Sequence, residues 1–600
     1  MLSNFAQVVN ADSSGEIMID VSANSSLSIA AVAIREVPLD IPAQGLVVST
    51  TNDVVDDDFS EGELSLREAI LIANEVAGEN TITFDGGVFT DVASSVVLLS
   101  LGELGITETL TIDASALSQP ITIYAQQNSR VLNFSANTGD LTLSDLTVTG
   151  GTEGTGGGGG IRFDSNGTVA LTDSTVSGNS GLDGGGIYAD LGTVTLTDST
   201  ISGNTSGSRG GGINTFAGSV SLTNSTVSGN TSDFRGGGIY TFLGSVSVTN
   251  STISGNTSGD AGGGINTFDG SVSVTNSTIS GNTSDSFGGR GGGIYTTGSV
   301  SLNNSIVAGN ESASDNDIFG SVFGANNLVG DGTGIISGLT NGTNGNQIGT
   351  SADPIDPLLG PLADNGGPTQ THALLPGSPA INAGDPAAVA GAGGVAEFDQ
   401  RGFPRVVGTI DIGSVELQAI PDQGLVVSTN SDVVDGVFSD GQLSLREAIL
   451  IANDVAGENT ITFDGGVFTD VASSVVLLSL GELGITETLT IDASALSQPI
   501  TIDAQQNSRV LNFSANTGDL TLSDLTVTGG RTEGTGASGG GIRFNSNGTI
   551  TLTNSTISGN TSGDAGGGIY TYFGSVSVTN STISGNTSGC LLYTSPSPRD

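Results

Sequence analysis

GGGIYTFLGSVSVTNSTISGNTSGDA, residues 236–261, is the cleanest copy of a unit that recurs along the chain. A glycine triplet followed by isoleucine returns four times at steps of 26 residues and once at a step of 29, and it appears twice more near the C-terminal end. Self-similarity at such a period indicates stacked units, each burying its apolar face against its neighbours. The isoleucines of this set are Ile161, Ile187, Ile213, Ile239, Ile265, Ile294, Ile542 and Ile569.

One unit carries three short β-strand patterns. Residues 245–249 alternate strictly, so that Val246 and Val248 face one side and the hydroxyls face the other. Two further runs that favour strands occupy 239–242 and 252–254. Glycine and asparagine separate the three runs, and both tolerate positive φ at corners. Three strands and three corners predict one coil of a parallel β-helix, whose strands pair with the next coil at about 4.8 Å.

An asparagine closes each unit after Ser-Gly, or once after Ala-Gly. Asn-Thr-Ser is formally an acceptor for N-glycosylation. Alternatively, equivalent amides in a stack bond one another as an internal ladder. Strict recurrence at the coil period favours the ladder. Its predicted members are Asn179, Asn204, Asn230, Asn256, Asn282, Asn310, Asn560 and Asn586.

The segment EGELSLREAILIAN, residues 61–74, departs from the repeat. Ser65 and Glu68 have the spacing of a capping box, and the apolar residues that follow recur at helical spacing. Because the open end of a β-helix exposes unpaired strand edges, we predict a short capping helix here. We interpret Arg67 and Glu68 as charges on the helix surface rather than as a catalytic pair.

The chain then begins again, because residues 44–151 return as 423–530 at a constant offset of 379. Ser444 and Glu447 stand at the equivalent positions of the second copy, which predicts a second capping helix. Repetition of a whole module favours an architectural role over a single active site. The expected segments are a lead at 1–43, a cap with irregular coils at 44–150, regular coils at 151–310, a region rich in glycine, proline and asparagine at 311–420, a second cap with irregular coils at 421–530, and further regular coils at 531–589.

The last segment, CLLYTSPSPRD at 590–600, interrupts a coil and holds the only cysteine. It resembles translated sequencing-adapter sequence, and we interpret it as an artefactual tail. We expect the natural gene to continue past Gly589 with further coils of the same period and a closing region.

The charge is strongly unbalanced, with 61 acidic residues against 14 basic ones, all arginine, and a net charge of −47. This balance argues against nucleic acid as a partner, because phosphate binding needs a basic surface. It is consistent with weak binding of Ca²⁺, and we expect no dedicated cofactor. No stretch reaches the length of a membrane span.

Three motifs carry a resemblance to known families. LSLREAILIAN followed by GENTITF resembles the CSLREA-type motif of large bacterial surface proteins, with Leu64 and Leu443 in place of the family's cysteine. The GGGI and SGN coils resemble right-handed β-helix repeats of the pectin-lyase-like superfamily and of polymorphic outer-membrane proteins. DPLLGPLADNGGPTQTHALLPGSPAINAG, with DQRGFPR and DIGSVE, resembles the choice-of-anchor Q domain.

The resemblance implies an all-β protein of two tandem right-handed parallel β-helix modules, with 92–310 as one continuous stretch. It implies an extracellular or cell-surface location and an unidentified surface ligand or glycan as partner. It assigns no catalytic residue. A non-catalytic, structural or adhesin-like rod is therefore our first expectation.

Two other functions stay open. One is a polysaccharide lyase or hydrolase of the pectin-lyase-like class, which needs clustered carboxylates and a base. We expect no such cluster with an arginine in one deep cleft, and we interpret His372, the only histidine, as a surface or hydrogen-bonded turn residue. The other is a glycan- or ice-binding face made by aligned hydroxyls such as those of Ser219, Ser221, Ser245 and Ser247.

Charged residues recur at the corner before the glycine triplet. Stacking is expected to bring Asp183 near Arg209 and Arg235 near Asp260. Exposed pairs of this kind contribute about 0–1 kcal/mol each, so we interpret them as solvated corner charges. The corner positions are Asp183, Arg209, Arg235, Ala261 and Arg290.

Overall fold

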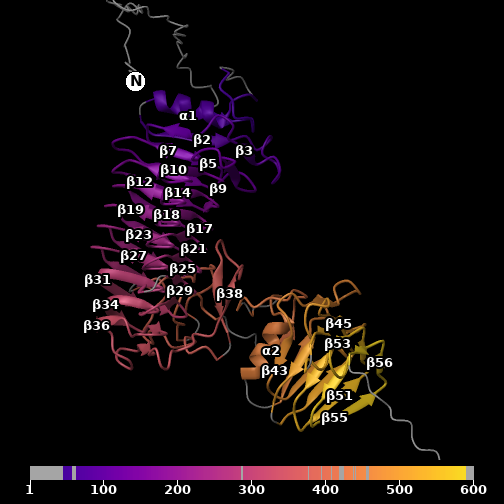
Figure 1. Cartoon of the computed structure of the whole chain (residues 1–600). Helices are drawn as coiled ribbons and strands as arrows, with labels where there is room; N and C mark the ends of the chain where they lie inside the picture. Colours follow the sequence, from indigo (N-terminus) through magenta and orange to yellow (C-terminus); the bar gives the residue numbers. More distant parts are fainter. Residues whose placement is uncertain are drawn as a thin grey trace, which may run out of the picture. The chain divides into compact units, whose positions relative to one another are not determined.

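The structure is a computed structural model that describes residues 45–589 with short gaps. The gaps are 57–61, 77, 286–287, 376, 393–394, 407–408, 418–423, 437, 439–440, 455–457, 516 and 535. The predicted lead at 1–43 and the predicted tail at 590–600 lie outside the described residues. Figure 1 shows the first module from indigo to red and the second from orange to yellow. No helix in the described part of the chain is long and apolar enough to cross a membrane.

Each repeat folds as one coil, and the strands of successive coils are parallel. The coil quoted above contains β23 (Ile239–Thr241), β24 (Val246–Thr249), β25 (Thr252–Ser254) and β26 (Thr257–Ser258). The first three correspond to the predicted strands. The two-residue β26 lies in the corner after Gly-Asn, where Thr257 and Ser258 pair with the next coil. The predicted all-β parallel β-helix is confirmed.

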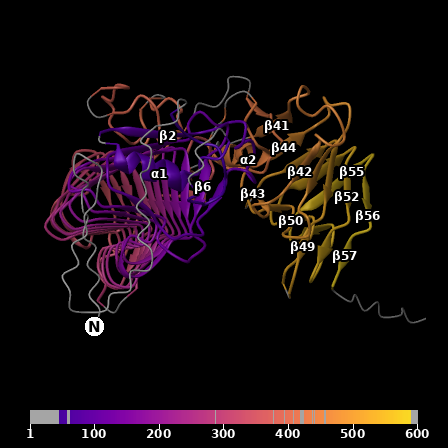
Figure 2. The same cartoon turned by 90° about the horizontal axis from the view of Figure 1, so that it is seen from above.

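The register between coils follows the repeat. Ile239 pairs with Ile265 and Val246 pairs with Val272, so identical side chains stack in columns. The isoleucine and valine columns point inward and are almost completely buried. Burying such a side chain contributes about 1.5–3 kcal/mol. Seen from above, the coils of the first module therefore lie over one another (Figure 2).

The coils of the first module continue beyond the last Gly-Asn signal at Asn310. One sheet contains 11 strands, from β3 (Val96–Leu98) to β37 (Gln347–Ile348). Its last members carry no glycine triplet, but Leu328 and Val329 still fill the interior column. The repeat motif therefore ends before the fold does, because inward-facing apolar residues suffice to add a coil.

A capping helix lies over the first coils of each module (Figure 1). In α1 (Leu66–Glu75), the backbone N of Glu68 donates to Ser65 Oγ at 3.1 Å, and the backbone N of Ser65 donates to Glu68 Oε2 at 3.1 Å. Ser444 and Glu447 make the same two bonds at the start of α2 (Leu445–Asp454). Burial, assisted by the neighbouring Asp435, raises the pKa of Glu447 to about 8.

The interpretation of Arg67 as a surface charge is wrong. Its guanidinium donates to both carboxylate oxygens of Asp53, at 2.6 and 3.1 Å, and to the carbonyls of Gly102 and Glu103. Arg67 therefore connects the capping helix to the coil beneath it through hydrogen bonds. Arg446 makes the equivalent contacts in the second module.

The described residues between 359 and 417, called here the lateral segment, run along the side of the coils. They contain an antiparallel hairpin of β38 (Leu359–Ala363) and β39 (Thr371–Leu374), which lies near β25 and β29 (Thr278–Ser280) in Figure 1. Thr252 Oγ1 donates to Gln400 Oε1 at 2.6 Å, and Ser414 N donates to Thr278 Oγ1 at 3.1 Å. Thr226 Oγ1 donates to the Gln370 carbonyl at 2.6 Å. The segment therefore covers the outer face of this sheet.

The second module repeats the plan over fewer coils. After β40 (Leu425–Val427) and α2, its strands form sheets of six, five, four and three strands that end at β57 (Thr587–Ser588). It has its own buried core, built from Ile461, Phe513, Phe544 and their neighbours.

Candidate functional site

The predicted asparagines form one column in each module, and all of them except Asn586 are buried. The backbone N and Nδ2 of Asn230 both donate to Asn256 Oδ1, at 3.0 and 2.9 Å, and Nδ2 also donates to the carbonyl of Ile201. The same contacts link Asn179 through Asn204 onward to Asn310, and link Asn560 to Asn586. With their amide groups bonded inside the rod, the first-module members are closed to glycosylation.

A second column of serines was not foreseen. Ser225 Oγ accepts from the backbone N of Ser199 at 3.2 Å and donates to the carbonyl of Thr223 at 2.7 Å. Ser251 and Ser277 repeat this pattern one coil further at each step. The signal was present, because these serines recur at the same period as the asparagines. Each of these serines lies at the corner between two strands, and its Oγ accepts from the backbone N of the equivalent serine in the preceding coil.

Asp317 ends the asparagine column in the first module. Its Oδ1 accepts from the backbone N and Nδ2 of Asn310 at 3.0 and 2.8 Å, and its Oδ2 accepts from the backbone N of Asp331. Burial raises the pKa of Asp317 to about 6, because the charged form loses its hydration.

This raised pKa predicts a pH-dependent stability. The pKa of this carboxyl is near 3.8 in the unfolded chain and about 6 in the native protein. Between pH 3.8 and pH 6 the native carboxyl is therefore protonated while the unfolded one is ionised. The stabilising contribution of the protonated form is therefore complete below pH 4 and is lost as the pH rises through 6. Relative to Asp317→Asn, the wild-type free energy of unfolding should fall by about 2.4 kcal/mol between pH 4 and pH 7. Urea titrations of both proteins measure this difference, and a constant difference would contradict it.

His372 is hydrogen-bonded, as one of the two predicted alternatives has it, but it lies in a strand and not in a turn. It lies on β39, where Nδ1 bonds the carbonyl of Gly360 at 2.7 Å and Nε2 bonds Ser254 Oγ at 2.8 Å. Because the carbonyl can only accept, Nδ1 carries the proton in the neutral ring and Nε2 accepts from the serine. Burial lowers the pKa of His372. The neutral ring therefore connects the lateral segment to the coils, because it hydrogen-bonds Gly360 with one nitrogen and Ser254 with the other.

The motifs DQRGFPR and DIGSVE meet in a buried polar cluster. Arg401 and Asp399 form an ion pair at 2.8 Å with both side chains fully buried. The guanidinium of Arg405, also fully buried, donates to the carbonyls of Gly413 and Ser414 and to Asn250 of the coils. Burial raises the pKa of Asp411 to about 6. These charges were missed as a group, because only the folded segment brings them onto the coil flank.

The outward face of the Gly-Gly-Gly-Ile strands carries the charged corners. Arg235 pairs with Asp260 at 2.7 Å, as the stacking argument requires. Arg209 is the register partner of Asp183, but its guanidinium lies over the rings of Tyr240 and Phe234, at 5.4 and 5.9 Å from the centroids. The strands of this face are β11 (Ile161–Phe163), β15 (Ile187–Ala189), β19 (Ile213–Thr215), β23, β27 (Ile265–Thr267), β31 (Ile294–Asn303) and β34 (Ile318–Ala325).

Aromatic rings line the next corner of the same face. The rings of Phe216, Phe242 and Phe268 stack with centroids 5.1 and 5.2 Å apart and nearly parallel planes. The outward serines lie beyond this corner, and Ser245 Oγ bonds Ser271 Oγ at 3.0 Å. An exposed hydroxyl row therefore exists where the alternation places it, and its binding of glycan or ice stays a prediction.

A shallow pocket opens on this face at the first regular coils of the first module. It has a volume of about 270 Å³, and its walls include Asn137, Asp190 and Leu191. Arg162 also lines it and is held by Asp164 at 2.7 Å. The arginine of this pocket is therefore already neutralised by a neighbouring carboxylate.

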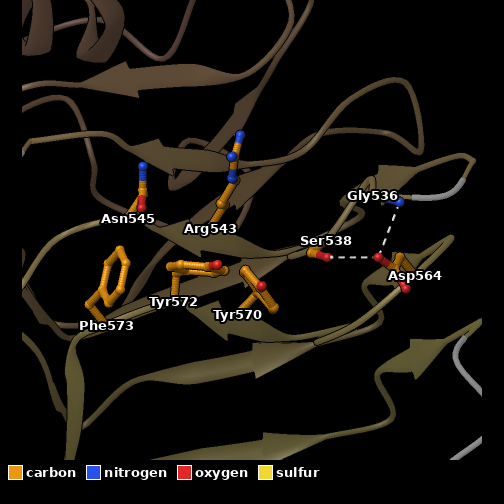
Figure 3. Close-up of a pocket in the computed structure, with 8 residues that line it drawn as sticks. All are labelled: Gly536, Ser538, Arg543, Asn545, Asp564, Tyr570, Tyr572 and Phe573. Atoms are coloured by element: carbon orange, nitrogen blue, oxygen red, sulfur yellow. Dashed lines mark hydrogen bonds between the residues drawn. The ribbon is translucent and has the colours of Figure 1, made fainter.

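A larger pocket of about 340 Å³ occupies the equivalent place in the second module. Arg543 lies on β50 (Ile542–Phe544) directly beside Tyr570 of β54 (Ile569–Thr571), as Arg162 lies beside Tyr188. Figure 3 shows Arg543 and Asn545 projecting together, with the rings of Tyr570, Tyr572 and Phe573 below them. Ser538 and Asp564 lie at the other end and are hydrogen bonded (Figure 3).

Comparison with known proteins bears on the fold. The family model described as "Right handed beta helix region" matches residues 131–312. Pectate lyase Pel9A is structurally similar over 62% of this chain and 96% of its own, with 13% identity and a TM-score of 0.37. The PL6 family alginate lyase AlyGC is similar over 88% of this chain and 78% of its own, with 13% identity and a TM-score of 0.19. No curated protein sequence matches.

The family-model match supports a right-handed β-helix and assigns no chemistry. Within the described residues, no three His, Cys, Asp or Glu side chains are grouped so as to hold a metal ion. A further pocket of about 290 Å³ near the end of the first module is lined by Glu311, Asp317, Asp331 and Asp356.

Proposed function

We propose that this protein is a non-catalytic rod of the extracellular space or the cell surface, with a structural or adhesin-like role. The supporting observation is that the repeated polar residues are used to build the rod. The asparagine column bonds only along the stack and to coil carbonyls, and the serine column does the same. The CSLREA-like caps and the anchor-like segment fit the surface location.

The polar residues outside the columns favour the same conclusion. A polysaccharide lyase needs a base that is free to remove a proton from the sugar. Both ring nitrogens of His372 are bonded within the fold, and Arg162 and Arg235 are paired with carboxylates. Arg401 and Arg405 are buried in the polar cluster that DQRGFPR and DIGSVE form on the side of the coils. These groups are therefore committed to structure.

Product release tests this proposal directly. The full chain, incubated with polygalacturonate or alginate with and without Ca²⁺, should give no rise in the absorbance of unsaturated products above the rate of the boiled protein. A rise that is lost in Arg543→Ala but kept in Arg162→Ala would establish a lyase and contradict the proposal. Antibody labelling of intact source cells checks the location, and labelling only after permeabilisation would exclude it.

A further inference from the structure

An apolar strip lies along one corner of the first module, between the two strands that each regular coil contributes to the sheet of β23 and β24. Leu191, Phe216 and Leu243 stand at this corner in three successive coils and remain 50%, 48% and 49% exposed. Phe242 and Phe268 continue the strip, and their rings belong to the same stack as that of Phe216. The backbone N of Leu243 donates to the carbonyl of Phe216 at 2.8 Å, which ties one corner to the next.

The apolar strip belongs to the uninterrupted part of the rod. Regular coils lie on both sides of it, because β11 and β31 are strands of the same sheet as β19, β23 and β27. Figure 1 shows β19, β23, β27 and β31 following one another along the first module. The lateral segment contacts a different sheet, which contains β25 and β29. The described residues therefore leave the strip open to solvent, and an exposed apolar row of this kind indicates a binding surface.

A polar pocket adjoins the apolar strip at Leu191, which forms one of its walls. This is the pocket of about 270 Å³ at the first regular coils. It is lined by the guanidinium of Arg162 and by the carboxylates of Asp164 and Asp190, so that its charged groups sum to a negative charge. The side-chain amide of Asn166 adds a donor and an acceptor. The pocket therefore suits a ligand rich in hydroxyl groups and disfavours an anion.

A row of serine hydroxyls runs beside the apolar strip. Ser219, Ser245 and Ser271 each come directly after the glycine that ends the corner. Ser245 Oγ bonds Ser271 Oγ at 3.0 Å, and the ring centroids of the neighbouring strip lie 5.1 and 5.2 Å apart. The apolar and hydroxyl rows thus share the spacing of the coils. An extended peptide, which advances by about 3.3 Å per residue, does not match this spacing. A β-1,4-linked pyranose chain advances by nearly one coil spacing per sugar.

We propose that the pocket and the apolar strip form one track that binds a neutral polysaccharide along the rod. A pyranose presents C–H groups on its faces and hydroxyls around its rim. The C–H groups pack on the exposed ring of Phe216 and on Leu243. Asp190 accepts hydrogen bonds from hydroxyl groups, and the serine row both donates and accepts them. Successive sugars therefore meet equivalent contacts in successive coils.

Charge selects a neutral chain over an acidic one. The net charge of −47 repels a polyanion from the whole surface, and the pocket itself is negative. Asp269, at the corner beside Phe268, places another carboxylate at the far end of the apolar strip. This inference rests on the proposed function, since it names the ligand class of the same non-catalytic rod.

Calorimetric titration of the full chain tests the inference. The neutral probes are the hexamers of β-1,4-linked glucose, mannose and xylose, the acidic probe is hexagalacturonate and the cationic probe is the hexamer of glucosamine. At least one neutral hexamer should bind more tightly than both charged probes. It should also bind about tenfold or more tightly than its own trimer, because the track extends over five successive coils, from Asp164 to Phe268. No binding of any neutral hexamer, tighter binding of a charged probe, or equal affinity of trimer and hexamer would overturn the inference.

Two substitutions locate the binding track. Phe216→Ala and Leu243→Ala should each weaken binding of the neutral hexamer, the first about tenfold, which corresponds to about 1.4 kcal/mol. Leu98→Ala is the matched control, because Leu98 is 47% exposed on a different sheet, and it should bind as the wild type does. Circular dichroism checks that the variants remain folded. Unchanged binding by folded Phe216→Ala and Leu243→Ala would overturn the inference. Shortening of the bound hexamer would instead overturn the proposed non-catalytic function.

Discussion

Replacing Asn256 with leucine is expected to lower the free energy of unfolding of the first module by about 3–5 kcal/mol. Asn256 Oδ1 accepts two bonds from Asn230, and its Nδ2 donates to Asn282 Oδ1 and to the carbonyl of Val227. Leucine has no polar side-chain atom, so the substitution removes all four of these hydrogen bonds at once and leaves their partners in place. The remaining donors and acceptors are fully buried, so water cannot replace the lost bonds.

Ser247→Leu is the matched control, because it introduces the same side chain on the exposed face of the same coil. Its effect should stay within about 0.5 kcal/mol. Urea denaturation followed by circular dichroism measures both changes. Hydrogen exchange of peptides from 226–284 should show faster exchange in Asn256→Leu at this coil and its neighbours, because each coil contacts only the adjacent ones. Equal stability of the two variants would show that the column contributes nothing.

Gly244→Ala is expected to destabilise the first module by about 3 kcal/mol or more. A Cβ at this position would lie 1.8 Å from the carbonyl oxygen of Gly218 in the preceding coil. A Cβ added to Gly218 would lie at the same distance from the carbonyl oxygen of Gly192, and one added to Gly270 at the same distance from that of Gly244. The backbones of successive coils therefore approach closely along the whole column of glycines. A backbone atom cannot rotate away as a side chain does. The coils must therefore separate or tilt.

Gly105→Ala provides the comparison for this variant. Gly105 lies on β4 (Leu104–Ile106), and an added Cβ there meets no atom within 4 Å. Alanine also reduces the freedom of the unfolded chain, so the change should be neutral or slightly stabilising. The midpoint of thermal unfolding separates the two cases. If Gly244→Ala had the same midpoint of thermal unfolding as Gly105→Ala, the coil spacing would adapt to the added methyl group without loss of stability.

Sequence periodicity alone predicted the coils well, because the residues that contact one another occupy equivalent positions of successive repeats. A repeat of 26 residues with Ile239, Val246 and Val248 at fixed positions can bury these side chains only if successive copies stack in register. The capping box was equally readable, since Ser65 and Glu68 interact within one turn of helix. In both cases the residues that interact are near in sequence or repeat at one period.

Other features could not be read in this way. Thr252 and Gln400 bond across 148 residues, and nothing in either segment marks the other as its partner. The same holds for Arg405 and Asn250, which are 155 residues apart. The sequence therefore did not predict where residues 359–417 lie, and it made Arg67 look like a solvated charge.

The sequence by itself determined the coil, its register and the inward columns, because a period specifies contacts between equivalent positions. Only the tertiary structure decided what the non-repeating residues do. It placed 359–417 on the flank of the coils and showed Arg543 beside Tyr570, Tyr572 and Phe573 in one pocket. Such contacts depend on how a chain segment turns in space, and single substitutions such as Asp164 to Asn545 change the chemistry of a site without disturbing the repeat that supports it.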